Sequence, residues 1–190
     1  MTPALTKALD LHSPADIRMP AFPTPEETAA MRELNKVRAS ILDDDWPKKI
    51  AAFRSLFSLS RHDGGYPHPL LQPRLQLHMR LLREEFMEIV GAAQELSNAL
   101  DAAEEQAAFA EWVDGIIDLI YVGIGALCEA GFKPADINLL MQEVHASNLT
   151  KVDDEGKPIY DEGGKVLKGA NYVKADIAGV IAQIVEKADG

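Results

Sequence analysis

The chain has few of the features that mark secreted or membrane-spanning proteins. It contains one cysteine, Cys128, so no disulfide can form within the chain, and we expect a buried thiol and a cytoplasmic location. The first residues, "MTPALTKALDLHSPADIRMP", include no continuous apolar stretch of the kind that secretory signals carry. The longest apolar run, residues 119–128, is far shorter than the ~20 residues that cross a bilayer.

Basic residues are also scarce. Lys and Arg number 19 against 30 Asp and Glu, which gives a formal net charge of −11. Nucleic acids and anionic membrane surfaces bind basic patches, so this balance argues against both as partners. Between residues 84 and 132 there is no Lys or Arg at all. The hydrophobic fraction of 47% is nevertheless that of an ordinary globular domain.

Strand signals are too few for a substantial sheet, and helical patterns occupy most of the chain. We therefore predict an all-α fold, an antiparallel helical bundle. Residues 1–25 hold five prolines and predict an extended N-terminal arm, which leaves 26–190 as a single domain. The expected helices are 24–42, a helix starting near Asp45, 70–98, 103–130, Pro134–Asn148 and 174–188.

One segment departs from the helical pattern. Residues 151–172 are rich in Gly, Lys and Asp and contain two turn-like centres, "DDEG" and "DEGG". Glycine following acidic residues is typical of tight turns. We expect a short Gly/Lys-rich hairpin or loop near the C-terminus.

Acidic residues interrupt the two longest predicted helices. At about 100° per residue, Glu84, Glu85 and Glu88 project within one arc of the helix 70–98. Asp114 and Asp118, four residues apart, project side by side from the helix 103–130. Both sets share a sector with apolar residues, which predicts that they face the interior. Arg80 and Arg83 fall outside the acidic arc, so the sequence offers these acids no local cationic partner.

Carboxylates at contact distance repel one another, and a hard dication removes that cost. Mg²⁺ takes oxygen ligands and is typically held by a few carboxylates together with substrate phosphates. We therefore predict a Mg²⁺ site between two antiparallel helices, with Mn²⁺ as a substitute and more than one ion per site. A di-iron carboxylate bundle is the competing metal hypothesis, but it requires Glu-x-x-His, which this sequence does not contain.

Three stretches resemble the MazG-like all-α NTP pyrophosphatases. "REEFME" is similar to the Glu-Glu-x-x-Glu motif of that family, and "DGIIDLIYVGIGAL" resembles its second acidic motif. "HASNLTK" and "GKVLKGANY" resemble the His-x-Ser-Asn-x-x-Lys and Gly-Lys-Val-x-Lys-Gly-x-Asn-Tyr segments of one branch. The resemblance covers roughly residues 45–180. It implies an α-helical homodimer or higher oligomer that hydrolyses nucleoside triphosphates to monophosphate and pyrophosphate with Mg²⁺.

The resemblance also implies roles for single residues. Glu85, Glu88 and Asp118 match metal-binding acids, and Glu84 matches the first acid of the motif, so Glu84 and Glu85 become the catalytic candidates. Asp114 stands where the family usually has Glu, but one residue further away and one methylene shorter. A second register, Glu111-x-x-Asp114, therefore stays open.

Lysines return where the acidic helices end, and a triphosphate needs cations on the oxygens that metal leaves free. Lys151, Lys165 and Lys168 are therefore candidates for phosphate contacts. For Lys151 a structural role at a helix C-terminus is the alternative. Asn171 is a candidate for the base or sugar, while Tyr172 either stacks on a base or packs the loop. The remaining substrate-binding candidates are His145 and Asn148.

The predicted activity is hydrolysis of (d)NTP in nucleotide-pool house-cleaning. One alternative is a phosphoribosyl-ATP pyrophosphatase, which has related helices. Another is a non-catalytic helical dimerisation module whose acids bind Mg²⁺ for stability.

Overall fold

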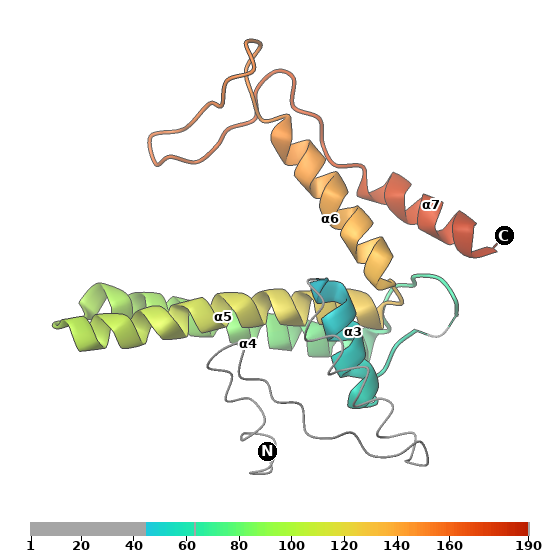
Figure 1. Ribbon diagram of the computed structural model, residues 1–190, viewed down its shortest axis with the longest axis horizontal. Helices are drawn as coiled ribbons and strands as arrows, with labels where there is room; N and C mark the ends of the chain where they lie inside the picture. Colours follow the sequence, from blue (N-terminus) through green and yellow to red (C-terminus); the bar gives the residue numbers. More distant parts are fainter. Residues whose placement is uncertain (1–44, 63, 190) are drawn as a thin grey trace, which may run out of the picture.

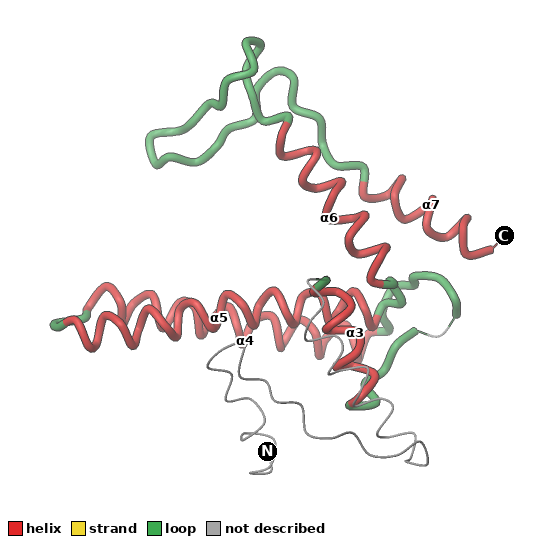
Figure 2. Tube along the Cα trace, viewed as in Figure 1, coloured by secondary structure: helices red, strands yellow, loops and turns green. Residues whose placement is uncertain are grey.

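The computed structural model describes residues 45–62 and 64–189, and in that part of the chain helices are joined by loops without a strand (Figure 2). The described helices are α3 (Trp46–Leu56), α4 (Gln72–Asn98), α5 (Ala102–Glu129), α6 (Pro134–Leu149) and α7 (Ile177–Asp189). The predicted all-α fold is confirmed, and these boundaries lie within a few residues of the expected ones. The predicted arm 1–25 and helix 24–42 lie outside the described residues.

The two longest helices, α4 and α5, run side by side along the long axis of the molecule (Figure 1). A short connection makes them antiparallel. Its last residue, Asp101, caps α5, because its side chain accepts hydrogen bonds from the backbone N–H of Ala103 and Glu104, each at 2.9 Å. This hairpin is the scaffold that carries both acidic motifs.

The end of α5 is fixed by Gly131. Its φ of 98° lies in the left-handed region, where glycine is favoured. The N–H of Phe132 reaches the carbonyl of Leu127 and the N–H of Gly131 reaches that of Cys128, both at 3.2 Å, which is the Schellman pattern of helix termination. The chain therefore turns sharply into α6.

The apolar core lies where α3, α6 and α7 meet the C-terminal part of α5. Its buried members are Ile50, Cys128, Phe132, Ile137, Leu140, Val180 and Ile184. The expected buried thiol is confirmed, and burial raises the pKa of Cys128. Asp45 caps α3 by accepting from the N–H of Lys48, and the predicted start of this helix near Asp45 is confirmed. The C-terminal part of α4 and the N-terminal part of α5 extend beyond this core (Figure 1).

The segment 151–172 makes two consecutive tight turns. In the first, the carboxylate of Asp153 accepts from the N–H of Glu155 and Lys157. In the second, Asp161 accepts in the same way from Gly163 and Lys165. Each turn closes one isolated antiparallel bridge, Val152 with Pro158 and Tyr160 with Val166.

Candidate functional site

Five carboxylates gather on one side of the α4–α5 hairpin. Glu85 on α4 is half-buried, and burial is the largest cause of its raised pKa. The charges of Glu88, Asp118, Glu84 and Asp114 raise the pKa of Glu85 further, in that order. Like charges act in this way only at short range. The acids predicted from two separate helices therefore form one cluster centred on Glu85.

The helices approach closely beside this cluster because of Gly115. A Cβ at that position would lie 2.9 Å from Cγ1 of Ile89, so only glycine fits without displacement. Both residues are buried, and they are the sequence neighbours of Glu88 and Asp114. The small residue thus sets the separation of the two helices at the point where their acids meet.

The donor chemistry of the cluster fits a hard dication, because carboxylate oxygens are the ligands that Mg²⁺ prefers. In the side-chain conformations of the described residues, no group of three or more Asp, Glu, His or Cys converges closely enough to hold a metal ion. Glu84, Glu88, Asp114 and Asp118 are exposed, so their side chains can rotate toward a cation. The residue types present therefore fit Mg²⁺, but their side chains would have to rotate to hold it.

Two expectations about these acids are wrong. The first was that they face the interior, whereas only Glu85 is partly enclosed, because no other described element covers this side of the hairpin. The second was that no local cation reaches them, whereas Arg80 Nε lies 3.7 Å from Glu84 Oε1 one helical turn away. A long flexible arginine crosses the angle that separates the two residues on a helical wheel. Both side chains are largely exposed, so this pair contributes little to stability. Glu111, the alternative ligand, is also exposed.

Part of the predicted phosphate-binding set meets at the end of α6. Lys168 Nζ lies 4.5 Å from the centre of the Tyr172 ring. A hydrogen bond with Ser147 and the charges of Lys168 and Lys151 lower the pKa of Tyr172. The hydroxyl of Ser147 also donates to the carbonyl of Val173 at 2.7 Å, which holds this part of the chain against α6. The two lysines and the tyrosine thus form a small basic cluster.

The other substrate-binding candidates are more dispersed. Asn171 donates from Nδ2 to Oδ1 of Asp154 at 3.1 Å, so its side chain is engaged within the segment. Lys165, His145 and Asn148 are exposed, the last two on α6.

The acidic cluster and the basic cluster do not meet within one chain. Figure 1 shows the segment 151–172 beyond the far end of α6, which leads away from the α4–α5 pair. The two motifs that the sequence places in one site are therefore separate in the monomer.

A buried charge cluster that sequence reasoning missed joins α3, α4 and α5. Glu129, 3% exposed, accepts from Arg54 Nη2 and from Arg74 Nη2, both at 2.7 Å, and from Arg74 Nε. His78 Nε2 lies 2.9 Å from Glu129 Oε2. Burial alone would raise the pKa of Glu129, but hydrogen bonds from Arg74, His78, Ser60 and Arg54 outweigh it and hold that pKa far below its usual range.

A signal for this cluster was available in the sequence. Glu129 follows a long apolar run and precedes Gly131 and Phe132, so its side chain is placed among core residues. A buried carboxylate requires cationic partners, and none lies nearby on its own helix. The partners had to come from other elements, and periodicity does not identify which ones.

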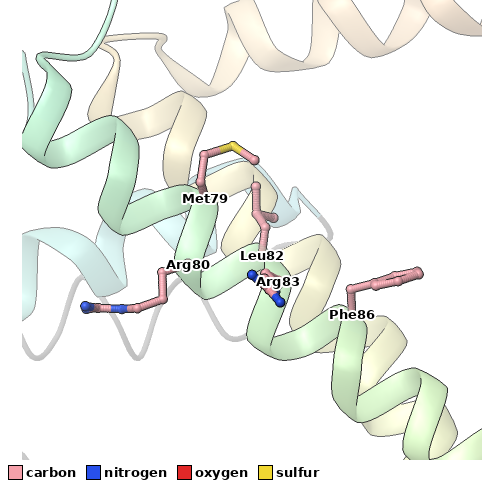
Figure 3. A pocket seen from close by; sticks show the side chains of 5 residues that line it. All are labelled: Met79, Arg80, Leu82, Arg83 and Phe86. Carbon is pink, nitrogen blue, oxygen red and sulfur yellow. The ribbon is translucent and has the colours of Figure 1, made fainter.

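On α4, an open groove of about 580 Å³ is lined by Met79, Arg80, Leu82, Arg83 and Phe86 (Figure 3). Met79 is 59% exposed and Phe86 is 54% exposed, which is unusual for large apolar side chains on a long helix. By the helical wheel, Met79, Leu82 and Phe86 lie on the opposite side of α4 from Glu84 and Glu88. The hairpin therefore has an acidic side and an apolar side that no other described element covers.

Among the described residues, no helix combines the length and apolar character needed to cross a membrane. No protein-family model matches the sequence, and no curated protein matches it.

Proposed function

We propose that the protein is a Mg²⁺-dependent nucleoside triphosphate pyrophosphohydrolase, which cleaves (d)NTP to (d)NMP and pyrophosphate in nucleotide-pool house-cleaning. The observation that carries the proposal is the convergence of acids from α4 and α5 on Glu85, whose pKa they raise. Such a cluster suits divalent cations, and clusters of this kind with perturbed pKa values are typical of functional sites. The resemblance of the two acidic motifs to the MazG-like pyrophosphatases supplies the reaction.

Each acid has a distinct part in this proposal. Glu85, Glu88, Asp114 and Asp118 hold Mg²⁺, which when bound neutralises phosphate oxygens and lowers the pKa of a water molecule. Glu84 or Glu85 accepts the proton of the water that attacks the α-phosphorus. A raised pKa suits Glu85 to this role, because a general base works best with a pKa nearer to the working pH. Pyrophosphate is the leaving group.

The lysines complete the site from a second copy of the chain. Lys168 and Lys151 lie beside Tyr172, away from the acids of their own chain. In a homodimer, the basic cluster of one protomer faces the acidic cluster of its partner and binds the terminal phosphates. Tyr172 then packs on the base or sugar, since its ring is already half-exposed beside the cations.

The uncovered apolar side of the hairpin supports self-association. On α4 the apolar residues Leu75, Met79, Leu82 and Phe86 are spaced by four, three and four residues, which is the spacing of a coiled-coil seam. On α5 the corresponding exposed residues are Phe109, Val113, Ile117 and Ile120. Two such hairpins packed face to face bury these residues in a four-helix bundle.

The activity is tested by incubating the full chain with canonical and modified (d)NTPs in Mg²⁺ or Mn²⁺ and measuring pyrophosphate. We expect pyrophosphate and monophosphate as the products, and a loss of at least roughly 100-fold in Glu85→Gln. Glu95→Gln, an exposed change on the same helix, serves as the matched control and retains activity. Phosphoribosyl-ATP forms a separate arm. Turnover of that substrate alone would favour the alternative enzyme, and no turnover of any substrate would favour a non-catalytic module.

The shared site is tested by mixing two inactive variants. Glu85→Gln lacks an acid and Lys168→Ala lacks a cation, so a mixed dimer contains one intact site and one doubly defective site. Equal mixing with subunit exchange restores roughly a quarter of the wild-type rate, because half of the dimers are mixed. If the mixture is as inactive as its components, the lysine does not act across the dimer.

A further inference from the structure

A second cavity lies between the C-terminal ends of α3 and α5 and the start of α6. Its volume is about 330 Å³, within the range of small-molecule sites. It is lined by Ala51, Arg54, Ser55, Ser58, Leu59, Arg61, Cys128, Phe132 and Pro134. None of these residues belongs to the acidic or basic clusters described above.

The wall of this cavity is positively charged. Arg54 and Arg61 line it, and no described Asp or Glu does, although acids outnumber bases in the chain as a whole. Both guanidinium charges act on the thiol of Cys128, whose pKa they lower against the larger effect of burial. Both charges therefore act on a residue that lines the same cavity.

Two hydrogen bonds fix the position of the Arg54 side chain. Arg54 is 9% exposed, and its Nη2 donates to the carbonyl of Ser60 at 2.6 Å and to Glu129 at 2.7 Å. Its Nη1 makes no hydrogen bond within the described part of the chain. That nitrogen lies 3.6 Å from the position that a Cβ on Gly125 would occupy, so the missing side chain leaves space beside it.

The charge of Glu129 does not neutralise the cavity. Arg54 and Arg74 both bind this single carboxylate, so the buried cluster already has an excess of positive charge. Arg61 adds a further charge, is exposed, and forms no ion pair with a described residue. Arg54, Arg61 and Arg74 thus exceed the single carboxylate of Glu129 by two positive charges.

The turn after α3 shapes the cavity. Ser58 has a φ of 50°, in the left-handed region, and the N–H of Leu59 donates to the carbonyl of Arg54 at 2.9 Å. This turn folds the chain back toward α3, so that Leu59 and Arg61 line the cavity together with residues of α3. The apolar part of the lining includes Ala51, Leu59 and Phe132, so the cavity combines cationic and apolar side chains.

We propose that this cavity binds a small organic anion, a carboxylate or a phosphate carried on an apolar body about the size of one aromatic ring. The anionic group contacts Nη1 of Arg54 and the guanidinium of Arg61, which suits the planar, multidentate donors of arginine. The apolar body packs on Leu59 and Phe132. The site is separate from the acidic cluster and does not depend on the proposed hydrolysis.

The test is a titration of the full chain with benzoate, phenyl phosphate, inorganic phosphate and benzyl alcohol, followed by calorimetry and by backbone amide NMR. At least one aromatic anion binds saturably, with a dissociation constant on the order of 1 mM, and shifts the amide signals of residues that line the cavity. Benzyl alcohol and inorganic phosphate bind at least tenfold more weakly, because each lacks one half of the ligand. The comparison of benzoate with phenyl phosphate identifies the preferred head group.

Arg61→Gln and Arg83→Gln are the matched variants, since each removes one exposed arginine. Arg61→Gln weakens binding of the preferred anion at least fivefold, whereas Arg83→Gln, which alters the α4 groove, leaves it unchanged. The proposal is overturned if neither aromatic anion saturates, if Arg61→Gln binds like the wild type, or if inorganic phosphate binds as tightly as phenyl phosphate. Circular dichroism of both variants establishes that their helical content is unchanged.

Discussion

At the scale of single residues, the buried Glu129 joins three helices through charge. Arg54 comes from α3 and both Arg74 and His78 come from α4, while Glu129 itself ends α5. A buried ion pair does not in itself favour the folded state strongly, because desolvation offsets the attraction. Removing Glu129 is nevertheless costly, because the buried guanidinium of Arg54 loses its counter-ion.

Glu129→Gln is therefore expected to destabilise the protein by roughly 3 kcal/mol at pH 7. The folded-state pKa of Glu129 is lowered, so its contribution is fully present above the ordinary glutamate pKa of about 4.3 and is lost as the pH falls toward the folded-state value. The difference between variant and wild type should therefore narrow in acid. Urea denaturation at pH 7 and pH 3 measures both quantities. A difference of the same size at both pH values would show that charge is not the cause.

Substitutions at two helix ends are expected to change folding stability in opposite directions. Gly131 and Ser58 both occupy the left-handed position after a helix, but only one of them is glycine. Gly131→Ala should cost about 1–2 kcal/mol, and contact of the new Cβ with the carbonyl of Tyr66, 3.0 Å away, adds to that loss. Ser58→Gly should stabilise by about 1 kcal/mol by removing the same penalty. Thermal denaturation of the two variants checks the pair, and equal signs would contradict this explanation.

At the scale of elements, the sequence predicted the helices and the clustering of acids well. Capping residues such as Asp45 and Gly131 specify helix ends locally, and the positions of Glu85 and Asp118 along two long antiparallel helices specify that they meet. The exposure of the acids could not be predicted in this way. A wheel shows which residues share a face, but it does not show whether another element covers that face.

The acidic cluster on α4 and α5 predicts an unusual dependence of folding stability on pH. The pKa of Glu85 is raised in the folded state, so its contribution to stability is fully present below about pH 4 and is lost as the pH rises through the folded-state pKa. Glu85→Gln should therefore be more stable than the wild type by about 0.5 kcal/mol at pH 7 without Mg²⁺, and equal to it near pH 4. With saturating Mg²⁺ the order reverses, because only the wild type gains fully from the cation.

Urea denaturation with and without Mg²⁺ measures these differences, and Glu95→Gln again serves as the control. If Glu85→Gln remains more stable than the wild type by the same amount in Mg²⁺, the cation does not act at this cluster.

At the scale of the whole molecule, the hairpin extends beyond the core with large apolar residues exposed. This feature favours a homodimer built on α4 and α5, which also provides the second copy that the separated basic cluster requires. Spacing alone does not reveal this separation, because the position of 151–172 depends on the direction in which α6 leaves α5.

Met79→Glu is expected to convert the proposed dimer into a monomer, since it places a charge in the apolar seam. Met141→Glu is the matched control, because Met141 on α6 is 62% exposed and Met79 is 59% exposed. Light scattering coupled to size-exclusion chromatography gives the mass of each variant. Dissociation of both variants, or of neither, would place the interface elsewhere.

The central claim is that the acids of α4 and α5 form a single site for divalent cations. The most direct measurement is anomalous X-ray diffraction from crystals of the full chain soaked in Mn²⁺ with a nonhydrolysable nucleoside triphosphate. The account predicts an anomalous peak among the carboxylates of Glu85, Glu88 and Asp118, with triphosphate oxygens beside it. Carboxylates that face solvent without a peak at saturating Mn²⁺, or a peak bound elsewhere on the chain, would contradict it.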